Sequence, residues 1–400
     1  MSFGTAALVF GALVIAGALL SGIARRSFLS LTALFVLAGF VLGEGGAEVL
    51  HFDAESGFVH DLALCALILI LFRDGLEVEA EMLQSAWRLP LRKLVIAMPV
   101  TALVVALAAK LVAGLTWTEA LLLGALLSPT DPVLSSSVVT NPRVPRVIRH
   151  SLNLESGLND GLALPPVLAL TAVLSADKGF VWWRFVLQDV TLGVLAGVVL
   201  GYAASRLMPR STLERSLPDH QRALYGLGVA FLTYGATVLV HGNGVIAVFV
   251  CAITLGISRP DIRHYFEQRS ADIIELVKLG VFVVFGALLT LDGLFADGWG
   301  AVAIVAVTLL VARPVAVWIA LAGTGVDTAT KGFMAWFGPK GVATMTFSLI
   351  VLGQGIAAGD RIFNLAALVV VCSVLVHGLT DQPGVEWIAR RSGRRVSSPT

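Results

Sequence analysis

The chain has 400 residues, of which 57% are hydrophobic and only 14% are charged, and its formal net charge is +1. So few charges cannot cover the surface of a soluble domain, and the balanced charge offers no field for a nucleic-acid partner. The three cysteines show neither disulfide nor zinc-site spacing. The composition therefore predicts an all-α polytopic membrane protein.

Apolar runs long enough to cross a bilayer follow one another along the chain. We expect about thirteen transmembrane helices. They are predicted near residues 5–23, 29–44, 59–75, 90–114, 118–139, 149–175, 183–207, 221–240, 243–258, 270–291, 298–322, 330–355 and 360–380. The first run is followed, not preceded, by basic residues, which is the reverse of a cleaved signal peptide. We therefore expect it to be the first membrane span.

Most of the 28 basic residues fall in one alternating set of loops and flanks, beginning with Arg25 and Arg26. The positive-inside rule places that set in the cytoplasm. The sequence thus predicts an integral plasma-membrane protein with its N-terminus outside and its C-terminus inside, which requires an odd number of spans. Eleven spans, or thirteen with a re-entrant piece, also satisfy this rule. Residues 384–400 are expected to form a short basic cytoplasmic tail.

Two spans are interrupted at mid-depth. In "ALLLGALLSPTDPVLSSSVV" two prolines flank Thr130 and Asp131, and "FMAWFGPKGVATMTFSLI" contains the sequence Gly-Pro-Lys-Gly around Lys340. Proline breaks a helix, and lipid tolerates such a break only where protein or a cavity satisfies the freed backbone groups. The interrupted spans, the fifth and the twelfth, lie seven spans apart, as in an inverted repeat with its transport site at the midplane.

This layout predicts one transmembrane transport domain over residues 1–383. Repeat 1 covers about 5–175, a linking helix about 183–207, and repeat 2 about 221–380. Discontinuous helices 5 and 12 are expected to cross at the midplane.

Ionisable residues at bilayer depth are costly, so they are candidates for function. They are Asp131, Glu155, Asp160, Lys278, Arg313 and Lys340.

In "LNLESGLNDGLALPPVLAL" the residues Ser156 and Asp160 lie one helical turn apart and share a face, with Asn159 beside them. Glu155 points about 140° away from Asp160. We expect Glu155 to form a buried salt bridge with Lys340 or Arg313, and Asp160 to stay unpaired.

An unpaired buried carboxylate takes up a proton readily, because burial disfavours its charged form. Once deprotonated it is a hard ligand for a monovalent cation, so competition at Asp160 can couple the two fluxes. Thr130 offers a hydroxyl and a freed carbonyl nearby. Asp131 either caps the N-terminus of a half-helix or binds the cation directly; both alternatives stay open.

No Walker motif and no H-E-x-x-H motif occurs, so transport driven by an ion gradient fits better than hydrolysis, and no cofactor is expected. Two other classes remain as rivals. One is a cation channel, and the other is an intramembrane aspartyl protease that uses Asp131 and Asp160.

Six stretches together resemble the membrane domain of the sodium/proton exchanger family (NhaP and NHE type). They are "LLLGALLSPTDPVLSSSVV", "LNLESGLNDGLAL", "HGNGVIAVFVCAITLG", "FVVFGALL", "ARPVAV" and "VHGLT". The resemblance covers residues 5–383 and implies an inverted-repeat fold with a dimerisation domain, a mobile core and a homodimer. It implies Na+/H+ exchange, with K+ as the nearest rival substrate.

The resemblance also implies roles for individual residues. Asp160 is expected to bind the cation or the proton, with Thr130 and Ser156 completing a Na+ shell and Asp131 close by. Asn159 is expected to hold the unwound fifth helix, and an Asn-Asp pair resembles the electroneutral branch of one cation for one proton.

Two basic residues complete the implied site. Glu155 is expected to pair with a basic residue of the twelfth span, and Arg313 to act as a second structural or gating cation. Relatives commonly have Arg where Lys340 stands, so the chain departs from the family pattern at that position.

Overall fold

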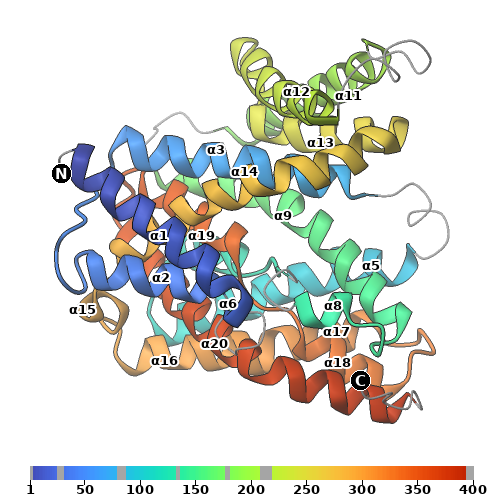
Figure 1. Ribbon diagram of the computed structural model, residues 1–400. Coiled ribbons are helices and arrows are strands. Elements are labelled where there is room, and N and C mark those ends of the chain that lie inside the picture. Colours follow the sequence, from blue (N-terminus) through green and yellow to red (C-terminus); the bar gives the residue numbers. More distant parts are fainter. Residues whose placement is uncertain are drawn as a thin grey trace.

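The computed structural model describes residues 3–24, 31–78, 87–131, 136–175, 181–207 and 219–392 (Figure 1). Every regular element among them is helical. The helices up to residue 207 are α1 (Phe3–Ala24), α2 (Leu31–Leu42), α3 (Gly57–Leu76), α5 (Arg88–Arg92), η1 (Lys93–Ala97), α6 (Met98–Val112), α7 (Trp117–Leu126), α8 (Ser136–Thr140), α9 (Arg146–Leu174), α10 (Trp182–Arg184), η3 (Phe185–Val190) and α11 (Thr191–Leu207).

The remaining helices are α12 (Asp219–Leu239), α13 (Gly244–Ser258), α14 (Pro260–Ala287), α15 (Leu291–Leu294), α16 (Trp299–Val307), η4 (Thr308–Ala312), α17 (Arg313–Ala320), α18 (Thr328–Trp336), α19 (Val342–Leu352) and α20 (Gly359–Arg391). Each apolar run expected from the sequence overlaps one of these helices or a consecutive set of them. The last helix continues to Arg391, so the start of the stretch expected as a tail is helical.

By length and composition, six of the described helices could cross a membrane, or seven if α13 and the bent start of α14 count as one span. The shorter apolar helices include α2, α7 and α19. The chain is thus an all-helical, membrane-spanning protein, and the total of about thirteen spans stays a prediction.

Local signals in the sequence set several helix starts. The Thr116 hydroxyl accepts from the Glu119 amide, and the Glu119 carboxylate accepts from the Thr116 amide, which forms a capping box at α7. The side chain of Asn243 accepts two amides at the start of α13. These caps satisfy backbone donors that would otherwise lack partners at the helix N-termini.

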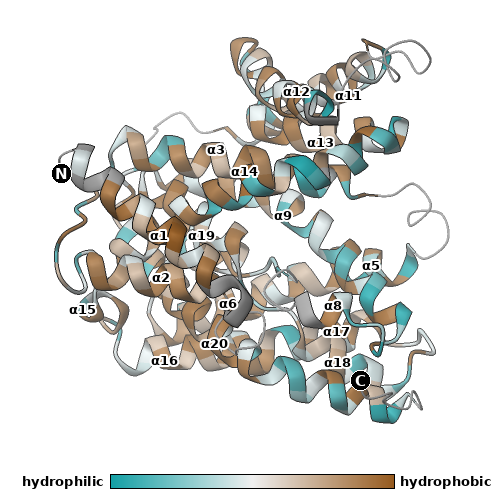
Figure 2. Ribbon diagram, viewed as in Figure 1, coloured by the Kyte–Doolittle hydropathy of each residue, from teal (hydrophilic) through white to brown (hydrophobic). Residues whose placement is uncertain are grey.

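The helices pack as two groups. One contains α2, α3 and α11–α14, and the other contains α6, α7, α9 and α16–α20 (Figure 1). The groups meet where α9 and α19 lie against α3. Figure 2 shows hydrophilic stretches on α5, α9 and α14, whereas α1, α2 and α16 are mostly hydrophobic.

Both interruptions expected from the sequence are present. α18 ends at Trp336 and α19 begins at Val342, while α7 ends at Leu126. Residues 132–135, which include Pro132, lie outside the described residues. The two unwound segments, residues 127–131 and 337–341, hold two of the six charged groups expected at depth, Asp131 and Lys340.

Candidate functional site

The two unwound segments lie directly against each other. The Asp131 amide donates to the carbonyl of Pro339 at 2.8 Å, and the hydroxyl of Thr344 donates to the carbonyl of Leu126 at 3.0 Å. Side chains and main chain of each break thus supply partners for backbone groups that the other break leaves free. The two interrupted spans therefore meet at their breaks.

Asp131 caps the half-helix α19. Its Oδ2 accepts a hydrogen bond from the Val342 amide at 3.2 Å, and its side chain is buried. A carboxylate at this place complements the positive end of the helix dipole. Gly341 makes the approach possible, because a Cβ there would lie 2.5 Å from the Asp131 carboxylate oxygen. Of the two roles left open by the sequence, the structure has the capping contact.

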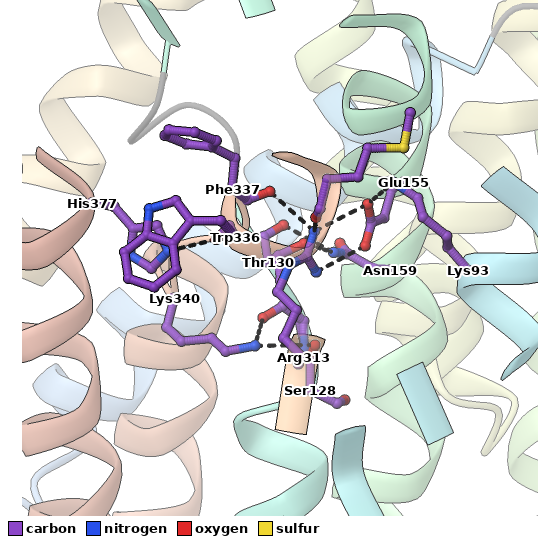
Figure 3. Close-up of polar contacts among 12 residues, drawn as sticks. Lys93, Ser128, Thr130, Glu155, Asn159, Arg313, Trp336, Phe337, Lys340 and His377 are labelled. Atoms are coloured by element: carbon purple, nitrogen blue, oxygen red, sulfur yellow. Dashed lines mark hydrogen bonds and ion pairs between the residues drawn. The ribbon is translucent and has the colours of Figure 1, made fainter. Parts of the chain in front are cut away.

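Lys340 serves the opposite helix end. Its Nζ donates to the carbonyls of Pro129 at 3.0 Å and Ser128 at 3.4 Å, just past the C-terminus of α7 (Figure 3). A cation there complements the negative end of that half-helix. The expected pairing of Glu155 with this lysine of the twelfth span is therefore wrong, because Lys340 is taken up by the carbonyls of the first break.

Glu155 instead meets two other cations. Arg313 donates Nη1 to Oε1 at 3.0 Å and Nη2 to Oε2 at 3.4 Å, and Lys93 forms an ion pair with the same carboxylate (Figure 3). Arg313 Nη2 also reaches the carbonyls of Met334 at 3.3 Å and Phe337 at 3.1 Å, at the end of α18. Of the two partners expected for Glu155, Arg313 is the one observed.

Sequence reasoning missed Lys93. It stands among Arg88 and Arg92, which the positive-inside rule assigned together to a cytoplasmic flank. Its side chain is in fact buried, whereas Arg88 is exposed. The sequence signal that could have found it is Pro99, six residues after Lys93. A proline there predicts an irregular helix. In such a helix, charge alone does not tell whether a basic residue belongs to the cytoplasmic flank or to the span.

Asn159 joins α9 to the first break. Its Nδ2 donates to the carbonyl of Thr130 at 2.9 Å and to the Thr130 hydroxyl at 3.1 Å. The amide thereby holds the backbone between Ser128 and Asp131 in its unwound form.

Asp160 is buried, and its Oδ1 has no hydrogen-bond partner among the described residues. Asp74, Asp131, Arg73 and Lys278 act on it electrostatically. Ser156, one turn before it on α9, is partly exposed. The carboxylate therefore sits among charged groups without a direct salt bridge to any described cation.

Asp74 adds a carboxylate to these surroundings from the other helix group. It is buried near the end of α3, and Arg73 donates to it at 2.6 and 2.9 Å. The Asp74 carbonyl lies 3.3 Å from where a Cβ of Gly157 would be, so α3 approaches α9 closely at a glycine. The site thus lies at the boundary between the two groups of helices.

No set of three or more His, Cys, Asp or Glu side chains in the described part of the chain is arranged to hold a metal ion. The residues expected to accompany Asp160, Thr130 and Ser156, offer hydroxyl and carbonyl oxygens instead. Such donors suit a hard cation of low charge, which is bound weakly enough to be released.

Residues 12–387 match the family model described as "Sodium/hydrogen exchanger, transmembrane". The chain belongs to the sodium/hydrogen exchanger family. The resemblance seen in the sequence is thereby confirmed over nearly the whole length.

Characterised members of the exchanger family are similar to this chain at moderate identity. The K+/H+ antiporter NhaP of Alkalimonas amylolytica is 26% identical over 95% of this chain and 66% of its own length. The Na+/H+ antiporter NhaG of Bacillus atrophaeus is 28% identical over 67% of this chain and 52% of its own length. The chain thus spans between about half and two thirds of the length of these curated relatives.

A solved structure gives the exchanger fold. The sodium proton antiporter MjNhaP1 of Methanocaldococcus jannaschii superposes with a TM-score of 0.82, at 18% identity, over 95% of this chain and 97% of that one. Identity this low supports the shared fold alone.

Proposed function

We propose that this protein is a secondary antiporter that exchanges one monovalent cation for one proton at Asp160. The observation that carries the proposal is a buried carboxylate with a free Oδ1, beside a crossing of two broken helices. Intramembrane carboxylates placed in this way mark proton and ion pathways. Membership of the exchanger family agrees with it.

Competition at one carboxylate accounts for coupling. Asp160 binds a proton or a cation, and the loss of one lets the other bind. The Thr130 carbonyl and hydroxyl and the Ser156 hydroxyl are the proposed further oxygen ligands. Asp131 stays close as the cap of α19, so in this proposal it contributes charge while it keeps its hydrogen bond to that helix.

Asn159 supports the proposed stoichiometry. It is an amide at the position beside Asp160, so only one exchangeable carboxylate stands there. The two loaded forms, with a proton or with a monovalent cation, then carry equal charge, and exchange is electroneutral.

The division into two groups of helices supports alternating access as part of this proposal. The two breaks lie in the group that contains α7, α9, α18 and α19, and so do Asp160 and Glu155. Asp74 and Lys278 belong to the other group. We propose an elevator-like movement of the first group against the second, in a homodimer in the plasma membrane with the N-terminus outside.

The choice of cation is open to measurement. Na+ is the substrate implied by the resemblance. K+ is the second candidate, because the relatives named K+/H+ antiporters cover 92% and 95% of this chain. No further cofactor enters the proposed cycle.

Proteoliposomes that hold a pH-sensitive dye test the function. Addition of Na+, Li+ or K+ should move protons in the wild-type protein and not in Asp160→Asn, while gel filtration shows that the variant is folded. Equal proton movement by the variant would refute the proposed site. Cation flux without proton flux would indicate a channel, and cleavage of a membrane substrate would indicate a protease.

A further inference from the structure

Lys93 is a buried cation that the proposed exchange cycle does not use. Its relative exposure is 1%, and its ammonium group pairs with Glu155 beside Arg313. A buried lysine is costly unless it is paired, so its place opposite a carboxylate is not incidental. Figure 3 shows Lys93 and Arg313 reaching Glu155 from different helices.

The backbone brings Lys93 there through a π-helical turn. η1 begins at Lys93 and is followed by Pro99, and η4 ends just before Arg313 and is followed by Pro314. A proline removes an amide donor and crowds the preceding turn, which favours such a widened turn. The fourth and the eleventh spans therefore carry the same irregularity, seven spans apart.

Antiparallel packing puts the two cations at one level. α17 packs against η1, and α16 packs against α6, so the two spans run in opposite directions. The first residue of η1 and the residue after η4 thus lie side by side. Arg92, next to Lys93, fixes this register by donating to the carbonyls of Ala320 at 2.7 Å and Ala322 at 3.0 Å.

The cluster formed by Lys93, Arg313 and Glu155 has two cations for one carboxylate. Arg313 alone already gives that carboxylate two charged hydrogen bonds. Lys93 adds a tie from the fourth span, so one carboxylate of α9 is held from both repeats. Asp160 stands five residues further along the same rigid helix, and Asn159 ties that helix to the first break.

We propose that Lys93 is a positioning residue for cation–proton exchange, which acts through Glu155 to hold α9, and with it Asp160, against the fourth and eleventh spans. The proposal rests on the proposed function at Asp160. In this proposal the charge of Lys93, and not its bulk, fixes the distance between Asp160 and the Thr130 carbonyl. Displacement of a reacting group by about 1 Å is enough to lower a rate up to a hundredfold.

Two single variants separate charge from bulk. Lys93→Met keeps the apolar stem, and Lys93→Arg keeps the charge; Lys110→Met, on α6, is the matched control. In the proteoliposome assay we expect Lys93→Met to lose about tenfold in maximal exchange rate, while Lys93→Arg and Lys110→Met stay within about twofold of wild type. Wild-type exchange by Lys93→Met, or an equal loss in a folded Lys93→Arg, overturns the proposal.

A double-mutant cycle tests the route through Glu155. Glu155→Gln leaves two buried cations without their carboxylate, so it should lower the melting temperature more than Lys93→Met does. Lys93→Met combined with Glu155→Gln should regain part of that melting temperature, because one unpaired cation is removed. A double variant no more stable than Glu155→Gln overturns the contact. The melting temperatures are measured without transport. They therefore still test the contact between Lys93 and Glu155 if the result for Asp160→Asn shows that the proposed function itself is wrong.

Discussion

The amide of Asn159 holds the carbonyl of Thr130 at 2.9 Å and its hydroxyl at 3.1 Å. This contact links an unbroken helix to a broken one. It places α9, which carries Asp160, beside the first break, the unwound segment of residues 127–131 that the prolines in the sequence predict. The proposed ion site is therefore assembled by a side chain that binds no ion.

Removal of that amide should loosen the break. Asn159→Ala leaves the buried Thr130 carbonyl without its donor, at a cost of about 1–3 kcal/mol. Asn159→Asp should be worse at alkaline pH, since an ionised carboxylate only accepts and would face the carbonyl. Melting temperatures at pH 6 and pH 9 measure this, and a pH-independent Asn159→Asp would contradict it.

The cap on α19 gives a second prediction. Asp131→Asn keeps an oxygen that accepts from the Val342 amide, so the cap of α19 loses only the interaction with the helix dipole, about 0.3–1 kcal/mol. We expect a folded variant with nearly unchanged apparent KM for the cation, and a clear loss of stability in Asp131→Ala. A large rise in KM for Asp131→Asn would show instead that the carboxylate binds the ion.

Lys340 gives a third prediction. Lys340→Met leaves the carbonyls of Ser128 and Pro129 without a donor, so we expect a loss of about 1–3 kcal/mol and reduced exchange. Lys340→Arg retains both donor and charge and should keep activity. Thermal unfolding and dye-monitored exchange on both variants check this, and equal behaviour of the two would speak against a role for the charge.

Gly338 tests the position of Arg313 without changing any charge. A Cβ at Gly338 would overlap the Arg313 guanidinium, so Gly338→Ala should displace it from Glu155 and lower both stability and exchange. Gly332→Ala is the control, because open space surrounds that position in α18. There alanine should be neutral or stabilising by up to about 1 kcal/mol. Similar results for both glycines would argue against the overlap.

The start of α18 provides a pH test outside the membrane spans. The side chain of Asp327 accepts from the Thr330 amide, and this hydrogen bond lowers the pKa of Asp327 below its usual value. A lowered pKa means that the stabilisation is present above the pKa of the unfolded chain and is lost as the pH falls through the lower, folded value. Asp327→Ala should therefore cost about 1 kcal/mol near neutral pH, and this cost should shrink as the pH falls through the lowered pKa of Asp327. A difference in melting temperature that is constant with pH would contradict this account.

The fold class was readable because bilayer depth, helix-breaking prolines and the spacing of charges are properties of short stretches. Helical phase alone also separates Glu155 from Asp160, because both lie on one helix and about 100° per residue fixes their directions. The same local rules could not find Lys93, whose depth depends on a widened turn and on packing against α17. They also could not choose between Lys340 and Arg313 as the partner of Glu155.

The sequence by itself determined that the protein is a membrane-spanning helical bundle with two interrupted spans. It also determined that Asp160 and Glu155 point to different sides of one helix. Only the tertiary structure decided the partners: Arg313 and Lys93 for Glu155, the half-helix α19 for Asp131, and the carbonyls of the first break for Lys340. The physical reason is that the direction of a side chain follows from its own helix. The distance to a partner on another helix follows from how the two helices pack.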